Sequence, residues 1–180
     1  AEHTCLELPL GVRITPHCAF GAGHHETTNM MIEALLQAKE EHLFDCATDV
    51  LDMGCGTGVL GIMAKKCGAS HVVAVDIDDK SVANTLENAS DNAVELDVRL
   101  GDTPPMSSYN LIMANIHRNI LVAQMPKYAE YLKVNGELWV SGFYQEDIPH
   151  LTLAAEAVGL THMETRHKNE WHWMRFRAIQ

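Results

Sequence analysis

The sequence predicts an α/β fold with a doubly wound, mostly parallel seven-stranded sheet that ends in a C-terminal antiparallel hairpin. Two observations lead to this fold class. Short apolar segments typical of buried strands alternate with segments of helical period, as in a parallel sheet covered by helices on both faces. Residues 160–179 instead alternate around a break at Lys168–Asn169, which indicates two antiparallel strands.

Each expected element follows from a local pattern. Apolar residues at helical spacing from Met30 onward predict a first helix over residues 27–42, with Thr27 or Thr28 as its N-cap. Nearly continuous apolar runs predict strands that are buried on both faces. The expected strands cover residues 49–53, 71–76, 94–100, 109–115 and 136–143, and the remaining helices cover residues 58–68, 79–92, about 120–132 and 145–158.

The composition limits the classes of protein to which this chain can belong. The chain has 180 residues, of which 47% are hydrophobic, so it can form one domain with a full core. No apolar run approaches the roughly 18 residues of a membrane span, and the start lacks the pattern of a signal peptide. We therefore expect no membrane partner.

The cysteines and the net charge indicate the cellular compartment and the kind of partner. Five cysteines are an odd number, and the absence of a CxxC pair argues against a disulfide framework or a zinc ribbon and favours a reducing cytoplasm. A net charge of −11 argues against direct nucleic-acid binding. The charge either serves solubility or provides a surface that attracts a basic partner.

A glycine-rich loop joins the first predicted strand to the next helix. In VLDMGCGTGVLG, Gly54 and Gly56 allow a sharp turn and close approach to a ligand, while Gly58 and Gly61 let the helix lie close to the sheet. Asp76 ends the following strand about twenty residues later, where a carboxylate can accept hydrogen bonds from both hydroxyls of a ribose. The loop, its strand–helix context and this acid together predict a nucleoside-containing ligand.

The details of the loop distinguish between two such ligands. A dinucleotide loop reads GxGxxG and holds a pyrophosphate at the helix N-terminus. Here Asp52 stands two residues before Gly54, and the loop resembles the first motif of S-adenosylmethionine-dependent methyltransferases. This resemblance implies that Asp52 faces the cationic methionine end of the cofactor and that Asp102 lies near its adenine. A terminal hairpin is typical of the same class I, Rossmann-like fold.

Asn115 ends the fourth predicted strand, at the edge where open α/β sheets bind their ligands. An amine that accepts a methyl group must be neutral and aligned with the reacting bond. The side-chain carbonyl of Asn115 could accept an N–H bond and orient the amine. Asn115 could equally cap the next helix, and the two roles are compatible.

Several segments together resemble the PrmA family of ribosomal protein methyltransferases. They are AFGAGHHETT at residues 19–28, the glycine loop with its following strand, the ANI that contains Asn115, and the NEW at residues 169–171. The resemblance extends from about Phe20 to Arg177. It implies that Phe20, Thr28, Gly54, Gly56, Asp76 and Asn115 contact S-adenosyl-L-methionine.

Within the first segment, His25 and Thr27 match the family pattern, whereas Ala22, His24 and Glu26 replace its usual Thr, Thr and Pro. A metal site at the adjacent His24, His25 and Glu26 is disfavoured, because neighbouring residues rarely bind one ion together and no HExxH motif is present. We therefore expect no metal.

The resemblance implies methyl transfer to lysine and N-terminal amines of a basic large-subunit ribosomal protein. We expect one methyltransferase domain, residues 1–180, that consists of an N-terminal segment with the cofactor-site loop (1–26), alternating helices and strands (27–159) and the hairpin (160–180). The resemblance concerns this domain. It also implies a recognition domain ahead of this segment, which residues 1–180 do not contain. Three alternatives remain: another methyl acceptor, a non-catalytic cofactor-binding module, and a nicotinamide dehydrogenase.

Overall fold

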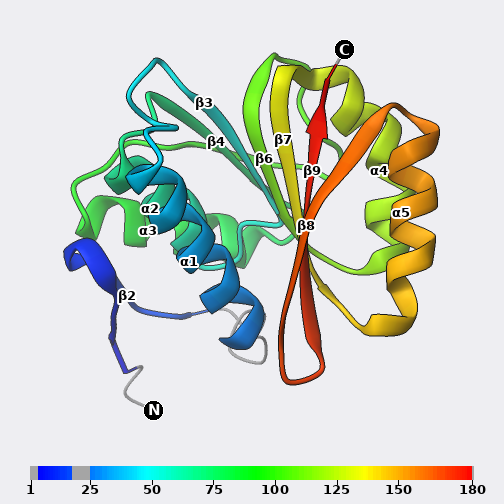
Figure 1. The fold of residues 1–180 in the computed structure, drawn as a ribbon. Coiled ribbons are helices and arrows are strands. Elements are labelled where there is room, and N and C mark those ends of the chain that lie inside the picture. The colour runs from blue at the N-terminus through cyan, green and yellow to red at the C-terminus, as the bar shows by residue number, and fades with distance from the viewer. Residues whose placement is uncertain (1–3, 18–24, 180) are drawn as a thin grey trace.

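The structure is a computed structural model that describes residues 4–17 and 25–179. A seven-stranded sheet forms its centre, with the strand order β5-β4-β3-β6-β7-β9-β8 (Figure 1). The first five strands in this order are parallel, and β9 pairs antiparallel with both β7 and β8. The predicted fold class is therefore confirmed.

The bounds of the elements are as follows. In chain order they are β1 (Leu6–Glu7), η1 (Pro9–Gly11), β2 (Arg13–Ile14), α1 (His25–Glu40), β3 (Asp49–Met53), α2 (Val59–Cys67), β4 (His71–Asp76), α3 (Asp79–Asp91), β5 (Asp97–Leu100), β6 (Tyr109–Asn115), α4 (Arg118–Tyr131), β7 (Leu132–Phe143), η2 (Gln145–Asp147), α5 (Ile148–Ala157), β8 (Leu160–Lys168) and β9 (Trp171–Ala178).

The helices cover the sheet on both faces. Figure 1 shows α1, α2 and α3 on one side and α4 and α5 on the other. Successive strand residues point to opposite faces, so Val50 joins the core beneath α1 and α2, while Leu51 joins the core beneath α4 and α5. This double burial explains why the central strands are apolar at nearly every position.

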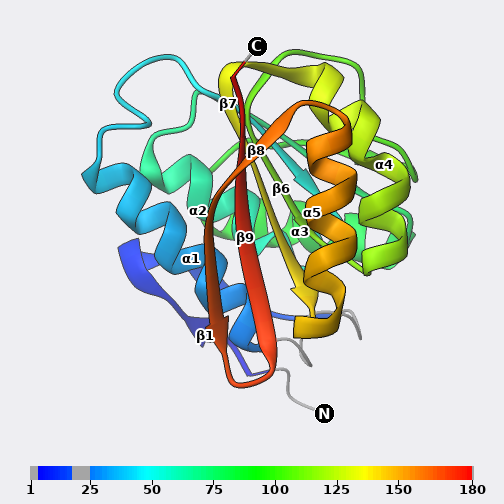
Figure 2. The ribbon, with the colours of Figure 1, turned by 45° about the vertical axis from the view of Figure 1, so that its right-hand side comes forward.

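The β8–β9 hairpin extends beyond the sheet and lies beside α1 (Figure 2). An ion pair between Lys168 and Glu33 connects the hairpin to that helix. Because β9 runs antiparallel to β7, the turn between β8 and β9 lies at the edge where the parallel strands end. The hairpin therefore contributes side chains to the edge at which the ligand site was predicted.

Several predicted boundaries differ from the structure. The helix α1 begins at His25, so Thr27 and Thr28 lie in its first turn and the prediction that one of them is the N-cap is wrong. The strand β7 begins at Leu132, four residues earlier than expected, because Leu132 pairs with Tyr109 and an irregularity accommodates Asn135 with a φ of +66°. The third strand of the prediction is shorter, since β5 begins at Asp97.

The N-terminal segment also contains structure that the sequence did not indicate. Strands β1 and β2 form a two-stranded antiparallel ribbon, separate from the main sheet. Within residues 4–17 and 25–179, no helix is long and apolar enough to cross a membrane. The thiols of Cys5, Cys46, Cys55 and Cys67 are free.

Candidate functional site

The strand order places the candidate site between β3 and β6. The chain winds from β3 outward to β4 and β5, and then returns to β6 on the other side of β3. Open α/β sheets bind ligands at such a switch point, outside the carboxyl ends of the strands. Gly54 follows β3 directly and Asn115 ends β6, so the two motifs of the sequence analysis flank this point.

The glycine loop adopts a backbone conformation that requires glycine. Gly54, Gly56 and Gly58 have φ values of +80°, +53° and +87°. A Cβ atom on Gly54 would lie 2.5 Å from Cγ2 of Ile116, and one on Gly58 would lie 2.8 Å from Cγ2 of Thr85. The loop therefore follows its left-handed path in direct contact with the residue after β6 and with α3.

Asp76 is bonded to this loop. Its Oδ2 accepts a hydrogen bond from the Gly56 N–H at 3.0 Å, and its Oδ1 accepts one from the Asp78 N–H at 3.0 Å. A carboxylate has about four acceptor positions, so each oxygen can still accept a ligand hydroxyl. The backbone of Gly101 donates to the Asp76 carbonyl at 2.9 Å, which places the exposed Asp102 beside the end of β4.

Asp52 lies beneath the loop, with only 2% of its surface exposed. Its Oδ2 accepts a hydrogen bond from the Gly61 N–H of α2 at 3.1 Å. Burial raises the pKa of this carboxyl from its ordinary value near 3.8 to about 7, and the charge of Asp76 adds to the increase. Asp52 therefore supports the loop and the helix that follows it, and its predicted contact with the cofactor stays a prediction.

Cys55 is a buried residue of the loop, between Gly54 and Gly56. The Thr85 hydroxyl of α3 lies 3.3 Å from its sulfur and 3.0 Å from the Gly56 carbonyl. Burial and the neighbouring Asp52 carboxyl raise the pKa of the thiol above its usual range, which disfavours the reactive thiolate. Thr85 was not predicted from the sequence.

Asn115 is held by the first turn of α1. Its Nδ2 donates a hydrogen bond to the Thr27 hydroxyl at 3.1 Å, which leaves its Oδ1 as an acceptor. A Cβ on Gly142 would lie 2.9 Å from that Oδ1, and Gly142 has a φ of +93°. The N-cap of α4 is His117, so the alternative that Asn115 caps this helix is wrong.

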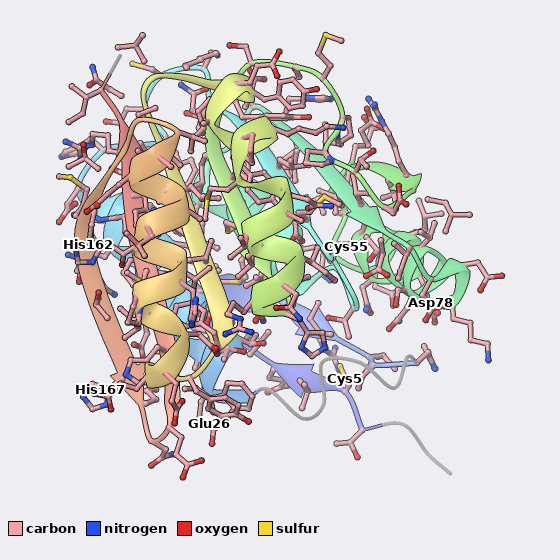
Figure 3. The ribbon with its side chains drawn as sticks, turned by 90° about the vertical axis from the view of Figure 1, so that its right-hand side faces the viewer. Cys5, Glu26, Cys55, Asp78, His162 and His167 are labelled. Carbon is pink, nitrogen blue, oxygen red and sulfur yellow. The ribbon has the colours of Figure 1, made fainter. Side chains whose placement is uncertain are left out.

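The β8–β9 turn lies at the same edge of the sheet as the candidate site. The rings of Tyr144 and Trp171 stack with their centroids 4.5 Å apart, and His167 stacks on His172 at 5.5 Å. Figure 3 shows His167 at the tip of the hairpin and Glu26, at the start of α1, on the same edge of the molecule. Seven residues line a cavity of about 610 Å³ here: Tyr144, Gln145, Glu146, His167, Asn169, Glu170 and His172. Asn169 and Glu170 belong to the NEW segment, but the sequence analysis predicted neither of them nor Tyr144 as part of a site.

The remaining predicted residues belong to the segment before α1. Thr28 is partly buried in the first turn of that helix. Phe20 and His24 lie outside the described residues. In the chain as described, residues 4–17 and 25–179, no three side chains of the metal-ligating types form a group that could hold an ion.

Comparisons with known proteins identify the family of this chain. The sequence profile of "Ribosomal protein L11 methyltransferase (PrmA)" matches residues 6–178. The chain belongs to the PrmA family. The ribosomal protein L11 methyltransferase of Porphyromonas gingivalis is 49% identical over 94% of this chain and 58% of its own length, and that of Thermosipho melanesiensis is 37% identical over 91% and 60%.

Solved structures give the same result for the fold. The ribosomal protein L11 methylase of Lactobacillus delbrueckii subsp. bulgaricus superposes with a TM-score of 0.80 at 25% identity, over 88% of this chain and 81% of that one. The N-methyltransferase NodS of Bradyrhizobium japonicum WM9, solved with S-adenosyl-L-homocysteine, superposes at 0.68 over 87% and 90%, and its 12% identity shows the fold alone. The chain spans less than two thirds of the curated PrmA relatives that it matches.

Proposed function

We propose that this chain is the catalytic domain of an S-adenosylmethionine-dependent protein N-methyltransferase that modifies lysine and N-terminal amines of ribosomal protein L11 in the cytoplasm. One observation supports this function above the others. A glycine loop bonded to Asp76 and an amide held at Asn115 flank the switch point of the sheet, in a chain of the PrmA family. The free thiols agree with a reducing cytoplasm.

The residues at the site fit the cofactor. S-adenosylmethionine combines an adenosine, whose ribose has two neighbouring hydroxyls, with a charged methionine end. Asp76 retains acceptor capacity for the hydroxyls, and the glycine loop allows close approach. Asp102 follows Gly101, whose N–H bonds to the Asp76 carbonyl, so in this proposal it would serve the adenine. When bound, the cofactor supplies a methyl group on a positively charged sulfur.

The acceptor nitrogen must displace that sulfur. Its lone pair would form the new N–C bond as the S–C bond breaks, and the methylated nitrogen would then lose a proton, so the acceptor must arrive as a neutral amine. A lysine must first lose its proton, which costs ~4.6 kcal/mol at pH 7, whereas an α-amine costs only about 1 kcal/mol. The Oδ1 of Asn115 accepts an N–H bond and so directs the lone pair of the neutral amine.

We assign the approach of the acceptor to the cavity beside the hairpin, because its wall is connected to Asn115 through β7. The hydroxyl of Ser141, at the end of β7, donates to the His172 carbonyl at 2.9 Å, and Ser141 is the register partner of Asn115. Carboxylates of Glu146 and Glu170 line the cavity, with the stacked Tyr144 beside them. Aromatic faces and carboxylates attract an ammonium group, as a basic substrate requires.

Two measurements test the proposed function. Calorimetry should detect S-adenosylmethionine and S-adenosylhomocysteine, and should detect no NAD under the same conditions. Transfer of an isotopic methyl group to purified L11 should then occur and should disappear in Asn115→Ala. Micromolar binding of NAD without any response to the methyl donor would contradict the cofactor. Transfer to other amines, but never to L11, would contradict the acceptor.

A further inference from the structure

Three asparagines of α3 and its C-cap hold the N-terminal segment by its backbone. Residues 13–17, which we call the strap, lie along one side of α3 as an extended chain. The side chains of Asn84, Asn88 and Asn92 are 1%, 0% and 6% exposed, although asparagine is usually a surface residue. Their burial needs an explanation, because buried amides must find partners.

The strap supplies those partners in a regular order. At Arg13, the N–H donates to Oδ1 of Asn92 at 2.9 Å, and Nδ2 of Asn92 returns a bond to the Arg13 carbonyl at 2.8 Å. At Thr15, the N–H donates to Oδ1 of Asn88 at 3.0 Å, and the carbonyl accepts from Nδ2 of Asn88 at 3.2 Å.

Asn84 continues the order. It donates from Nδ2 to the Thr15 carbonyl at 2.9 Å and accepts from the His17 N–H at 2.9 Å. The spacing is a geometric match, because four helical residues rise about 6.0 Å and two extended residues about 6.6 Å. Asparagines at every fourth position of the helix therefore meet every second residue of the strap.

Asn88 differs from the other two, because it also holds the glycine loop. Its Nδ2 donates a second hydrogen bond, of 2.8 Å, to the Thr57 carbonyl. One amide thus accepts from the strap, donates to the strap and donates to the loop, and all of its hydrogen-bonding groups are engaged. Thr57 lies between Gly56, which is bonded to Asp76, and Gly58.

We infer that Asn88 is a positioning residue for the cofactor loop and that it couples the docking of the strap to cofactor binding. The inference rests on the proposed function. With the strap docked, the Asn88 amide is fixed in the orientation that donates to Thr57. That bond holds the loop in the left-handed path on which Gly56 reaches Asp76. When the strap is released, the Asn88 amide can rotate, and the loop loses its side-chain support at Thr57.

Two matched substitutions separate this role from general packing. Asn88→Ala removes two hydrogen bonds to the strap and one to the Thr57 carbonyl. Asn92→Ala also removes two bonds to the strap, but its third partner is the Asn88 carbonyl within α3. Both variants should speed amide hydrogen exchange in the strap. Asn88→Ala, which also removes the bond to the loop, should weaken the affinity for S-adenosylhomocysteine by tenfold or more, whereas Asn92→Ala, which acts only through the strap, should weaken it by clearly less.

A second measurement uses the unsubstituted chain, so it tests the coupling even if Asn88→Ala does not fold. Coupling between two sites is reciprocal. If docking of the strap increases the affinity for S-adenosylhomocysteine by a certain factor, saturating S-adenosylhomocysteine should slow hydrogen exchange at the Thr15 and His17 amides by the same factor. Unchanged exchange at these amides, or an equal loss of affinity in both variants, would overturn the inference. Failure of the unsubstituted chain to bind S-adenosylhomocysteine would instead contradict the proposed function.

Discussion

The Nδ2 atom of Asn115 lies 3.1 Å from the hydroxyl oxygen of Thr27 and donates a hydrogen bond to it. The bond joins the carboxyl end of β6 to the first turn of α1, although the two residues are 88 positions apart in the chain. It also fixes which atom of the Asn115 amide is engaged within the chain, and this bears on the acceptor-positioning role that we propose for Asn115. With Nδ2 engaged, Oδ1 is left to accept from a substrate N–H.

Substitution of Thr27 by Val should therefore impair catalysis more than binding. Valine has nearly the same shape and suits a position with 0% exposure, but it cannot accept from Asn115. We expect kcat to fall by about tenfold, because a loosely held amide orients the amine less well, while KM for S-adenosylmethionine changes little. Steady-state kinetics measures both constants, and Thr161→Val on the exposed face of β8 serves as the control. A kcat equal to that of the unsubstituted chain would exclude this role for Thr27.

Gly54→Ala should destabilise the fold and weaken the site. The alanine would be forced to a φ of +80°, and its Cβ would lie 2.5 Å from Cγ2 of Ile116. Backbone strain of this kind costs about 1–3 kcal/mol, and the clash adds to it. Removing Cγ2 in Gly54→Ala/Ile116→Ala should relieve the clash but not the strain.

Urea unfolding measures these changes. Gly101→Ala provides a matched control, since its Cβ would meet only Cγ1 of Val75 at 3.8 Å. We expect that control to change the free energy of unfolding by less than about 0.5 kcal/mol. If Gly54→Ala is as stable as Gly101→Ala, the loop does not need its left-handed conformation.

Asp52→Asn should stabilise the chain at neutral and alkaline pH and have little effect in acid. Burial raises the pKa of Asp52 from about 3.8 to about 7. The folded chain therefore binds more protons than the unfolded chain between about pH 4 and 7, so the contribution of Asp52 to stability falls as the pH rises through this window. The asparagine does not titrate and can still accept from Gly61.

The difference in unfolding free energy between Asp52→Asn and the unsubstituted chain should thus grow from about pH 4 and level off above about pH 7. The shift in pKa sets an upper bound of about 4 kcal/mol. Urea titrations at pH 4.5, 6 and 8 would follow it, with the exposed Asp91→Asn as the control. A constant difference across this range would mean that Asp52 is ionised throughout, as an exposed aspartate is.

Asp76→Ala should weaken the binding of S-adenosylmethionine by about 2–4 kcal/mol, because the ribose hydroxyls lose a charged acceptor and the Gly56 N–H loses its partner. Calorimetry measures the affinity. The affinity of Asp76→Asn should lie between those of the unsubstituted chain and Asp76→Ala, since an amide oxygen still accepts a hydrogen bond but carries no charge. Unchanged affinity in Asp76→Ala would show that the cofactor lies elsewhere on the chain.

The sequence predicted the fold because its signals were local and repeated. Apolar strands such as residues 49–53 and the glycine loop that follows them are continuous patterns, and the structure reproduces the order of the elements. The two-residue strands β1 and β2 are too short to carry a pattern. The Asn115–Thr27 bond depends on the packing of α1 against the end of β6, which no local pattern encodes.

The three asparagines that hold the strap are visible as a pattern in the sequence. Asn84, Asn88 and Asn92 recur every four residues, on the face of α3 that a core-facing helix would fill with apolar side chains. Such polar spacing on a buried face indicates that the helix holds a backbone. The identity of that backbone, residues 13–17, follows only from the folded chain.

The last prediction concerns substrate recognition. This chain should bind S-adenosylmethionine but methylate L11 slowly when it acts alone. The glycine loop, Asp76 and Asn115 form a site from the core of this domain itself, whereas placing one chosen amine about 3 Å from the methyl group requires the substrate to be held. The net charge of −11 can raise the rate of encounter with a basic protein, but it cannot select one lysine among many. The chain spans less than two thirds of the PrmA relatives that it matches, and we propose that a recognition domain in the rest of such a protein makes that selection. A tether commonly increases effective affinity by about 10² or more.

The test compares this chain with a version extended at its N-terminus by such a recognition domain, using isotopic methyl transfer to purified L11. The extended version should act at least about tenfold faster at low L11 concentration and should modify fewer sites, because the tether raises the local concentration of one region of the substrate. Both versions should bind S-adenosylhomocysteine equally, which controls for damage to the cofactor site. Equal rates and equal site selectivity would mean that residues 1–180 recognise L11 unaided. The hairpin cavity lined by Tyr144 and Glu170 would then be the place to seek that recognition.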